Sequence, residues 1–285
     1  LRERCPDAAE KIHRVYNGLD LANLPAPPQR ERPPGPTTIL SVGRLVSFKG
    51  FEFLLEACAE LDRRNFDFRC QIVGDGPLRE KLETMIADLK LGRRVELCGS
   101  LSQEDVFSKL RSCDIFALAS VVDTAGASDV FPTVIMEAMA CAKPVVSTTL
   151  AGIPESVVDG VTGLLVPPAD WEALAGALDK LVRDRGLRAR FGEAGRERMT
   201  SEFDVVKTVE PLHQLFTSCL STSAVPQVVH APVERHDGAV DAPADVRAPR
   251  RERRGLRHTA QRECDARRPG DRPRLAGRPQ SRLSR

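Results

Sequence analysis

Two positively charged side chains fall in one short loop, where an apolar run gives way to a helical pattern. Arg44 and Lys49 lie within residues 43–50, which follow the apolar run at 39–43 and precede apolar residues spaced by three and four. Ligands of open parallel sheets bind at the carboxyl ends of strands, and two cations beside a helix N-terminus suit a diphosphate. The loop therefore predicts a phosphate-binding site, with two solvated surface charges as the alternative.

Two carboxylates lie in a second segment, residues 129–140. Pro132 suits the opening of a helix, which puts Asp129 just outside the helix and Glu137 about one and a half turns inside it. Such acids could hold sugar hydroxyls on either side of a phosphate that faces the backbone N–H groups near residues 130–133. Asp129 could instead be a helix cap. Glu137 has apolar neighbours in sequence, where an unpaired acid is costly, and this favours a functional role for it.

A third strand-to-helix turn carries Gly74 and Gly76, which would let the backbone approach a ligand. The dinucleotide-binding fingerprint needs a third glycine, but Glu80 stands at that position. A plain tight turn explains the two glycines equally well. The sequence shows no Ser/His/Asp arrangement and no metal cluster, and its five histidines fall outside these loops.

Short apolar runs that could be strands alternate with amphipathic stretches that could be helices. The strand candidates are residues 39–43, 68–74, 94–98, 114–119, 144–147 and 163–166. Near-continuous apolar runs are typical of strands buried on both faces. This alternation predicts an α/β domain with a doubly wound parallel sheet and right-handed crossovers.

Composition divides the chain into three parts. Residues 1–36 read as an interdomain or linker segment with two Pro-rich stretches, and residues 37–219 as one Rossmann-like domain that ends in two or three consecutive helices. Residues 1–219 carry 27 Lys and Arg against 32 Asp and Glu, whereas residues 220–285 carry 15 Arg against 8 acids. That last part lacks Ile, Phe, Tyr, Trp and Met, so we expect a disordered tail. It is either a segment for an acidic partner, such as a membrane surface or nucleic acid, or the translation of a GC-rich gene past a frameshift.

The eight cysteines form no CxxC pair, and most sit in apolar runs. We expect them to be small buried hydrophobic residues in a reducing cytosol, with zinc or disulfide use as the alternative. No signal peptide is visible, and no apolar run approaches the roughly 18–20 residues that span a membrane. These observations predict a cytoplasmic protein.

Taken together, residues 12–217 resemble the C-terminal domain of family 4 glycosyltransferases, which have the two-domain GT-B fold. The segments that carry the resemblance are residues 15–20, 43–50, 74–78, 129–137, 152–155 and 159–166. Segment 15–20 is similar to the interdomain segment of that family, and 129–137 to its E-x7-E motif. No single segment is decisive, but their order and separations are highly specific.

The resemblance implies a retaining hexosyltransferase that uses a nucleotide sugar, UDP more than GDP, without a metal. Arg44 and Lys49 would neutralise the donor diphosphate, Glu137 would bind the ribose hydroxyls, and Asp129 would contact the donor sugar. Further donor contacts are implied at Gly43, Gly74, Gly76, Gly99, Ser100, Leu101, Val130, Phe131, Pro132 and Thr133. The implied acceptor is a glycan or a lipid-linked sugar of surface polysaccharide assembly, with peripheral membrane contact and no specific nucleic acid.

Two departures from the family pattern matter. The first acid of the E-x7-E motif is Asp129, one methylene shorter than Glu, and Val130 follows where the family has Gly. Fewer than 40 residues precede the first strand, so we expect that the acceptor-binding N-terminal domain is missing from this sequence. A nucleotide-sugar-binding module without activity of its own is therefore an alternative. A nicotinamide-dependent dehydrogenase is another, which the absent third glycine and the Arg44/Lys49 pair oppose.

Overall fold

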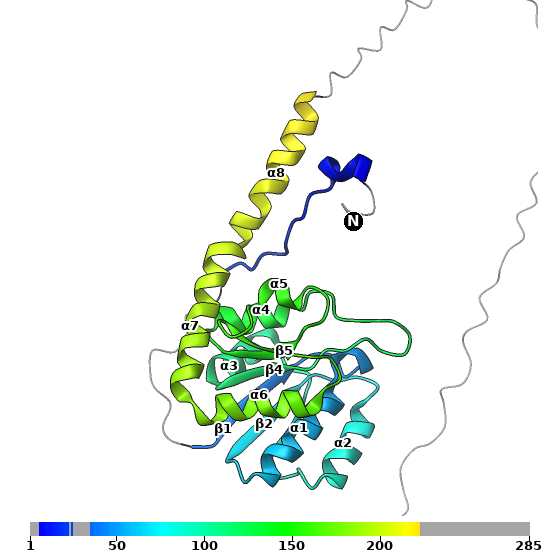
Figure 1. The fold of residues 1–285 in the computed structure, drawn as a ribbon, viewed down its shortest axis with the longest axis vertical. Coiled ribbons are helices and arrows are strands. Elements are labelled where there is room, and N and C mark those ends of the chain that lie inside the picture. The colour runs from blue at the N-terminus through cyan, green and yellow to red at the C-terminus, as the bar shows by residue number, and fades with distance from the viewer. Residues whose placement is uncertain (1–5, 23, 25–34, 223–285) are drawn as a thin grey trace, which may run out of the picture. The chain divides into compact units, whose positions relative to one another are not determined.

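The computed structural model describes residues 6–22, 24 and 35–222, and its centre is a six-stranded parallel sheet (Figure 1). Each strand lies within two residues of a predicted apolar run. The strands are β1 (Thr37–Val42), β2 (Phe68–Val73), β3 (Val95–Gly99), β4 (Ile115–Leu118), β5 (Val145–Thr148) and β6 (Gly163–Val166). The predicted fold class, a doubly wound α/β domain, is confirmed.

The sheet reverses its winding direction at β1. Its strand order is β3-β2-β1-β4-β5-β6, so β1 pairs with β2 on one side and with β4 on the other. Leu40 of β1, for example, lies opposite Gln71 of β2 and Phe116 of β4. Chains that leave β1 and β4 turn to opposite faces of the sheet, which opens a crevice at the carboxyl ends of these two strands.

Helices cover both faces of the sheet (Figure 1). They are α1 (Phe51–Arg63), α2 (Arg79–Asp88), α3 (Gln103–Ser112), α4 (Thr133–Ala140), α5 (Ile153–Ser156), α6 (Trp171–Arg183), α7 (Arg185–Glu202) and α8 (Val205–Thr222). Two 3-10 helices, η1 (Pro6–Lys11) and η2 (Ser47–Lys49), complete the described elements. The region 170–219 thus holds three helices, in agreement with the sequence.

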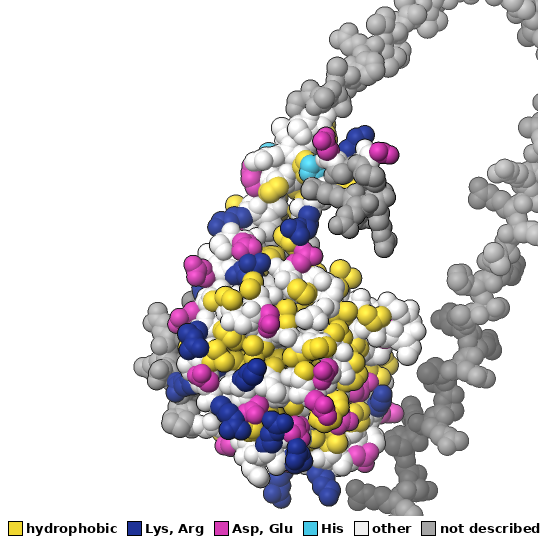
Figure 2. Space-filling view, viewed as in Figure 1, with side chains coloured by type: hydrophobic (Ala, Val, Ile, Leu, Met, Phe, Trp, Pro, Cys, Tyr) yellow, Lys and Arg dark blue, Asp and Glu magenta, His cyan; other side chains and the backbone are white. Residues whose placement is uncertain are grey.

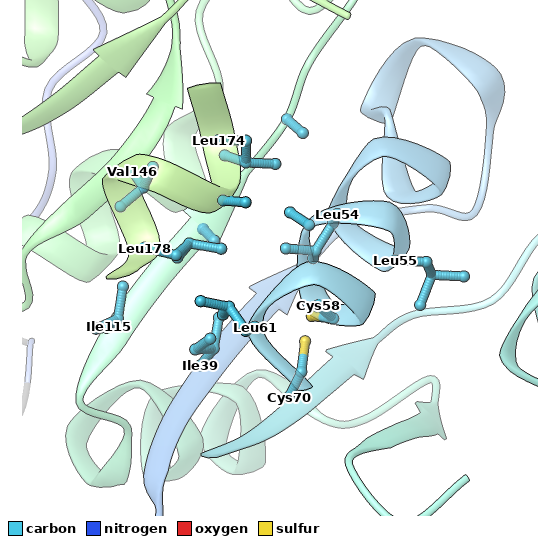
Figure 3. Packing of buried hydrophobic residues seen from close by; sticks show 14 of the residues in the cluster. Ile39, Leu54, Leu55, Cys58, Leu61, Cys70, Ile115, Val146, Leu174 and Leu178 are labelled. Carbon is cyan, nitrogen blue, oxygen red and sulfur yellow. The ribbon is translucent and has the colours of Figure 1, made fainter. Parts of the chain in front are cut away.

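Two hydrophobic cores sandwich the sheet because successive strand residues point to opposite faces. Ile39 packs with α1, α2 and α6, whereas its neighbour Leu40 packs with α3, α4 and Met199 of α7. Figure 3 shows the first core, in which Leu54 and Leu61 of α1 lie between the strands and α6. Leu, Ile, Val and Ala fill most of both cores, as the low aromatic content requires.

The six cysteines in the described range are free thiols, and Cys58, Cys70, Cys113 and Cys141 are buried. Cys58 of α1 faces Cys70 of β2 inside the first core (Figure 3). A hydrogen bond with Cys70 and burial hold the pKa of Cys58 well above its ordinary value, and burial raises the pKa of Cys113 to about 12. Cys58 and Cys113 therefore stay protonated, and the four buried cysteines pack as small hydrophobic residues.

The segment before the sheet runs beside the junction of α7 and α8. The Leu19 N–H donates to the Phe203 carbonyl at 2.8 Å, and the Val205 N–H donates back to the Leu19 carbonyl at 2.9 Å. A Cβ on Gly18 would lie 2.3 Å from the Thr208 hydroxyl, so only glycine fits there. Phe203 is the buried C-cap of α7.

Helix α8 continues to Thr222, three residues past the predicted domain boundary at 219. The rest of the predicted tail and the Pro-rich stretch at 25–34 lie outside the described residues. None of the helices in the described range is long and apolar enough to cross a membrane.

Candidate functional site

The loops at the carboxyl ends of β1 to β4 are joined by their backbones. The bonds are Gly43 N–H to Val73 O (2.9 Å), Leu45 N–H to Asp75 O (3.0 Å), Gly74 N–H to Gly99 O (2.8 Å) and Val121 N–H to Phe48 O (2.9 Å). They connect the loop after β1 to the loops after β2 and β4, and the loop after β2 to the end of β3. Peptide groups, which do not depend on side-chain type, thus fix the rim of the crevice.

Glycine is required where these loops touch. A Cβ on Gly74 (φ 136°) would lie 2.0 Å from the Gly43 carbonyl oxygen, and one on Gly76 (φ 159°) would lie 2.6 Å from the Leu45 carbonyl oxygen. A Cβ on Gly50 (φ 66°) would lie closer still, 1.8 Å from the Ala119 carbonyl oxygen. Loop-to-loop packing alone therefore requires glycine at these positions, and the predicted donor contacts of Gly74 and Gly76 stay a prediction.

Lys49 and Asp129, both predicted site residues, form an ion pair across the crevice between β1 and β4. Their side chains are 14% and 16% exposed, so the pair is largely withdrawn from water. The stem of Lys49 folds over Gly43, whose Cβ position would lie 3.3 Å from Lys49 Cε. The lysine charge is therefore held at the carboxyl end of β1, where the sequence predicted a diphosphate.

Arg44, the second predicted cation, lies on the surface of the same loop. Its side chain is exposed, and no acid in the described part of the chain pairs with it. Arg44 therefore differs from Lys49 in being unconstrained and fully hydrated.

The loop between β4 and α4 is attached to the β1 loop at a second point, which the sequence did not reveal. The Ser47 hydroxyl donates to Asp123 at 2.9 Å, and Asp123 also accepts the N–H groups of Ala127 (2.8 Å) and Ala125 (2.9 Å). The Ala127 N–H and the Ser47 hydroxyl hold the pKa of Asp123 below its ordinary value. This carboxylate therefore organises the loop that carries Asp129.

Glu137 is the fifth residue of α4 and is half-buried. Burial raises its pKa above the ordinary value. No hydrogen bond or ion pair joins Glu137 to Arg44, Lys49 or Asp129 within the described residues. A desolvated carboxyl group without a side-chain partner at a sheet's ligand-binding edge is typical of a functional position.

The remaining predicted contacts lie at two places on the same edge of the sheet. Gly99 ends β3 with φ 71°, and Ser100 and Leu101 follow it. Exposed Val130 and half-buried Phe131 precede α4, and the Gly152 N–H donates to the Val130 carbonyl at 2.8 Å.

The sequence suggests that Pro132 opens the helix, but Pro132 does not occupy the first helical position. It is the N-cap of α4, with extended backbone, and Thr133 is the first helical residue.

A groove of about 410 Å³ lies on the other side of the segment 129–132 and was not foreseen. The Tyr16 ring stacks on Phe131 with centroids 5.7 Å apart, and its hydroxyl donates to Glu155 at 2.6 Å. Arg14 also donates to Glu155, at 3.2 Å. Burial and the hydrogen bond between Tyr16 and Glu155 raise the pKa of Tyr16. The pairing of Tyr16 with Glu155, 139 positions away, left no signal in the local sequence pattern.

No group of three or more His, Cys, Asp or Glu side chains in residues 6–22, 24 and 35–222 is arranged to hold a metal ion. The positive charge in the described part of the crevice comes from Lys49 and Arg44.

Sequence comparisons identify relatives of this domain. Residues 25–198 match the family model "Glycosyl transferases group 1". The chain is 35% identical over 202 residues to the putative colanic acid biosynthesis glycosyltransferase WcaL of Salmonella typhimurium, which covers 70% of this chain and 49% of that protein. It is 37% identical over 202 residues to the amylovoran biosynthesis glycosyltransferase AmsK of Erwinia amylovora, with 70% and 48% covered. The chain thus spans about half the length of the curated relatives it matches.

Solved structures share the same architecture. A sucrose-phosphate synthase from Thermosynechococcus elongatus superposes with a TM-score of 0.65 at 26% identity, over 78% of this chain and 57% of that one. HepE from Anabaena, solved in complex with UDP and glucose, superposes with a TM-score of 0.63 at 25% identity, over 74% and 58%. The predicted GT-B half-fold agrees with these neighbours.

Proposed function

Because this chain belongs to the group 1 glycosyl transferases, we propose that its described domain binds a nucleotide-sugar donor at the carboxyl ends of β1 and β4. The ion pair of Lys49 and Asp129 is the observation that carries the proposal. It holds a cation suited to a phosphate and an acid suited to sugar hydroxyls side by side, at the edge where open parallel sheets bind ligands.

Each site residue has a role in this proposal. Lys49 and Arg44 neutralise the diphosphate, Glu137 accepts hydrogen bonds from the ribose hydroxyls, and Asp129 accepts them from the donor sugar. Backbone groups of residues 130–133 lie near the sugar and the phosphate next to it, and the nucleobase lies near Gly99 and Leu101. The half-buried state of Glu137 supports its role because a desolvated carboxylate gains more from hydroxyl donors than a hydrated one.

We propose that the reaction is a retaining transfer of a hexose from a UDP-sugar to a hydroxyl group of a glycan or lipid-linked acceptor. The acceptor oxygen bonds to the anomeric carbon on the face that the leaving phosphate vacates, and the bond between this carbon and the phosphate oxygen breaks. The acceptor proton passes to the departing phosphate. Lys49 and Arg44 stabilise the negative charge that develops on the nucleoside diphosphate.

The biological setting is also proposed by relationship. WcaL and AmsK are named for colanic acid and amylovoran biosynthesis, and HepE has been solved with UDP and glucose. We propose a role in surface polysaccharide assembly on the cytoplasmic side of the membrane, with peripheral membrane contact through the acceptor.

A ligand panel tests donor binding directly. Calorimetric titration with UDP, UDP-glucose, GDP-mannose and NAD should show saturable binding of a UDP ligand and none of NAD. Binding of NAD alone would contradict the proposal and favour a dehydrogenase.

Transfer of radiolabelled sugar to a glycan acceptor then separates two functions. Transfer supports the enzyme, whereas donor binding without transfer by the same preparation favours a nucleotide-sugar-binding module.

A further inference from the structure

The Lys49–Asp129 pair connects two groups that the proposed reaction uses separately. Both side chains are largely buried, at 14% and 16% exposure, and they lie on loops 80 positions apart in sequence. When a phosphate of a ligand binds Lys49, Asp129 therefore loses its positively charged partner.

The Lys49 side chain has little room to move away from Asp129 when a ligand binds. Its stem packs over Gly43, and its ammonium lies 6.0 Å from the Phe48 ring centroid. Asp129 sits three residues before the N-cap of α4, on a loop that Asp123 fastens to Ser47. Because both loops are held, a phosphate that reaches Lys49 comes close to the Asp129 carboxylate.

The cost of this approach depends on what else the ligand carries. A nucleotide sugar brings phosphates for Lys49 and hydroxyl donors for Asp129, so both members of the broken pair find new partners. A nucleoside diphosphate brings only the phosphates, and leaves a desolvated carboxylate beside a second negative charge. An unpaired charge in such a setting is strongly unfavourable.

From this asymmetry we propose that Asp129 discriminates between the sugar-bearing donor and the nucleoside diphosphate product. Once the sugar has left, re-formation of the Lys49–Asp129 pair expels the product. Asp129 is thereby a specificity-determining residue as well as a sugar ligand. This inference rests on the proposed function, since it takes the donor to be a nucleotide sugar.

The test compares two dissociation constants in three proteins. UDP and UDP-glucose are titrated into the wild type, Asp129→Asn and Asp88→Asn at one ionic strength. Asp88→Asn is the control because it removes the same charge from an exposed residue, the last of α2, outside the proposed site. If GDP-mannose proves to be the tighter donor, GDP and GDP-mannose replace the uridine pair.

In Asp129→Asn we expect UDP to bind about tenfold more tightly while UDP-glucose binds no better, so that the ratio of the two constants shifts at least tenfold. Asp88→Asn should leave that ratio within about twofold of the wild type. An unchanged ratio in Asp129→Asn, an equal gain for both ligands, or the same shift in both variants would overturn the proposal.

Two further outcomes remain interpretable. If Asp129→Asn does not fold, as judged by its melting transition, Asp129→Ser carries the same test with a small neutral hydroxyl. If the wild type binds neither nucleotide, the proposed function itself fails, and this result differs from binding with an unchanged ratio.

Discussion

The two ends of the parallel sheet hold their charges in different ways. At the amino-terminal end, Arg94 donates to Asp62 at 2.9 Å and to Asp67 at 3.0 Å, and Arg64 of the α1 C-cap donates to Asp179 of α6 at 3.0 Å. Figure 2 shows Lys and Arg side chains gathered with Asp and Glu at the lower end of the view, over α6 and α1. In each of these pairs at least one side chain is 40% exposed or more.

At the carboxyl-terminal end, backbone contacts form the framework. Peptide hydrogen bonds and close glycine contacts join the loops, and the largely buried pair of Lys49 and Asp129 spans them. Glu137 lies nearby in the chain with a raised pKa and no described side-chain partner. The comparison teaches that ion pairs between distant residues occur at both ends, and that the Lys49–Asp129 pair is distinguished by the burial of both its side chains.

The largest expected effect comes from breaking the backbone framework. Gly74→Ala places a Cβ at 2.0 Å from the Gly43 carbonyl and should lower the free energy of unfolding by about 3–4 kcal/mol, measured by urea denaturation. Gly126→Ala is the control, because Gly126 also has a positive φ (80°) but its added Cβ would meet nothing within 4 Å, and it should cost only about 1 kcal/mol. Equal losses in both variants would mean that the loops adjust freely.

Removing the buried cation should have the next largest effect. Lys49→Met should weaken UDP binding about 100-fold, since it deletes a charged phosphate ligand and leaves Asp129 unpaired. Lys180→Met removes an exposed lysine from the last turn of α6, at the other end of the sheet. Calorimetry should find the UDP affinity of Lys180→Met unchanged. A comparable loss in this variant would show that Lys49 acts only through the general positive charge of the domain.

Glu137→Gln should weaken binding less than Lys49→Met does, and it should raise stability. We expect UDP affinity to fall about tenfold, because ribose hydroxyls lose a charged acceptor. Burial raises the pKa of Glu137, so the folded state binds this proton more tightly than the unfolded state, and stability falls as pH rises from the ordinary carboxyl pKa through the raised one.

The Gln variant should therefore melt at a higher temperature than the wild type at pH 7. This gain should vanish once the pH falls below the ordinary pKa of a glutamate. A pH-independent difference in melting temperature would show that the Glu137 charge is not desolvated in solution.

The smallest effect is expected at the amino-terminal end. Arg94→Met should cost about 1 kcal/mol of unfolding free energy, because its partners Asp62 and Asp67 are 41% and 73% exposed and water weakens both pairs. Its nucleotide affinity should match the wild type. A loss above that size, measured by the same denaturation series, would show that this end is also tightly coupled to the fold.

Local pattern was enough to predict the strands and some helix starts. The six apolar runs became the six strands because burial on both faces demands continuous apolar residues. Residues 102–105 resemble a capping box, and the Ser102 hydroxyl accepts the Asp105 N–H at 3.1 Å. Pro77 suits a first helical position, but α2 begins at Arg79 because the Leu78 N–H bonds to the Leu45 carbonyl of another loop.

The site residues could be named from the sequence, but their pairing could not. Nothing in the local pattern indicates that Lys49 meets Asp129, or that Ser47 meets Asp123 76 positions away. These contacts depend on where two loops on different strands end, which only the assembled sheet determines. Family resemblance supplied roles for single residues, whereas the ion pair that relates them required the three-dimensional structure.

The clasp between Leu19 and the junction of α7 and α8 has a mechanical consequence. The chain arrives at the domain and departs from it through adjacent points, held by the bonds of Leu19 to Phe203 and Val205. A pull on the chain before Tyr16 and after Val205 would load the Tyr16–Glu155 bond and these two bonds before any tension reached the sheet. The contacts of this segment therefore shield the sheet from forces transmitted along the chain.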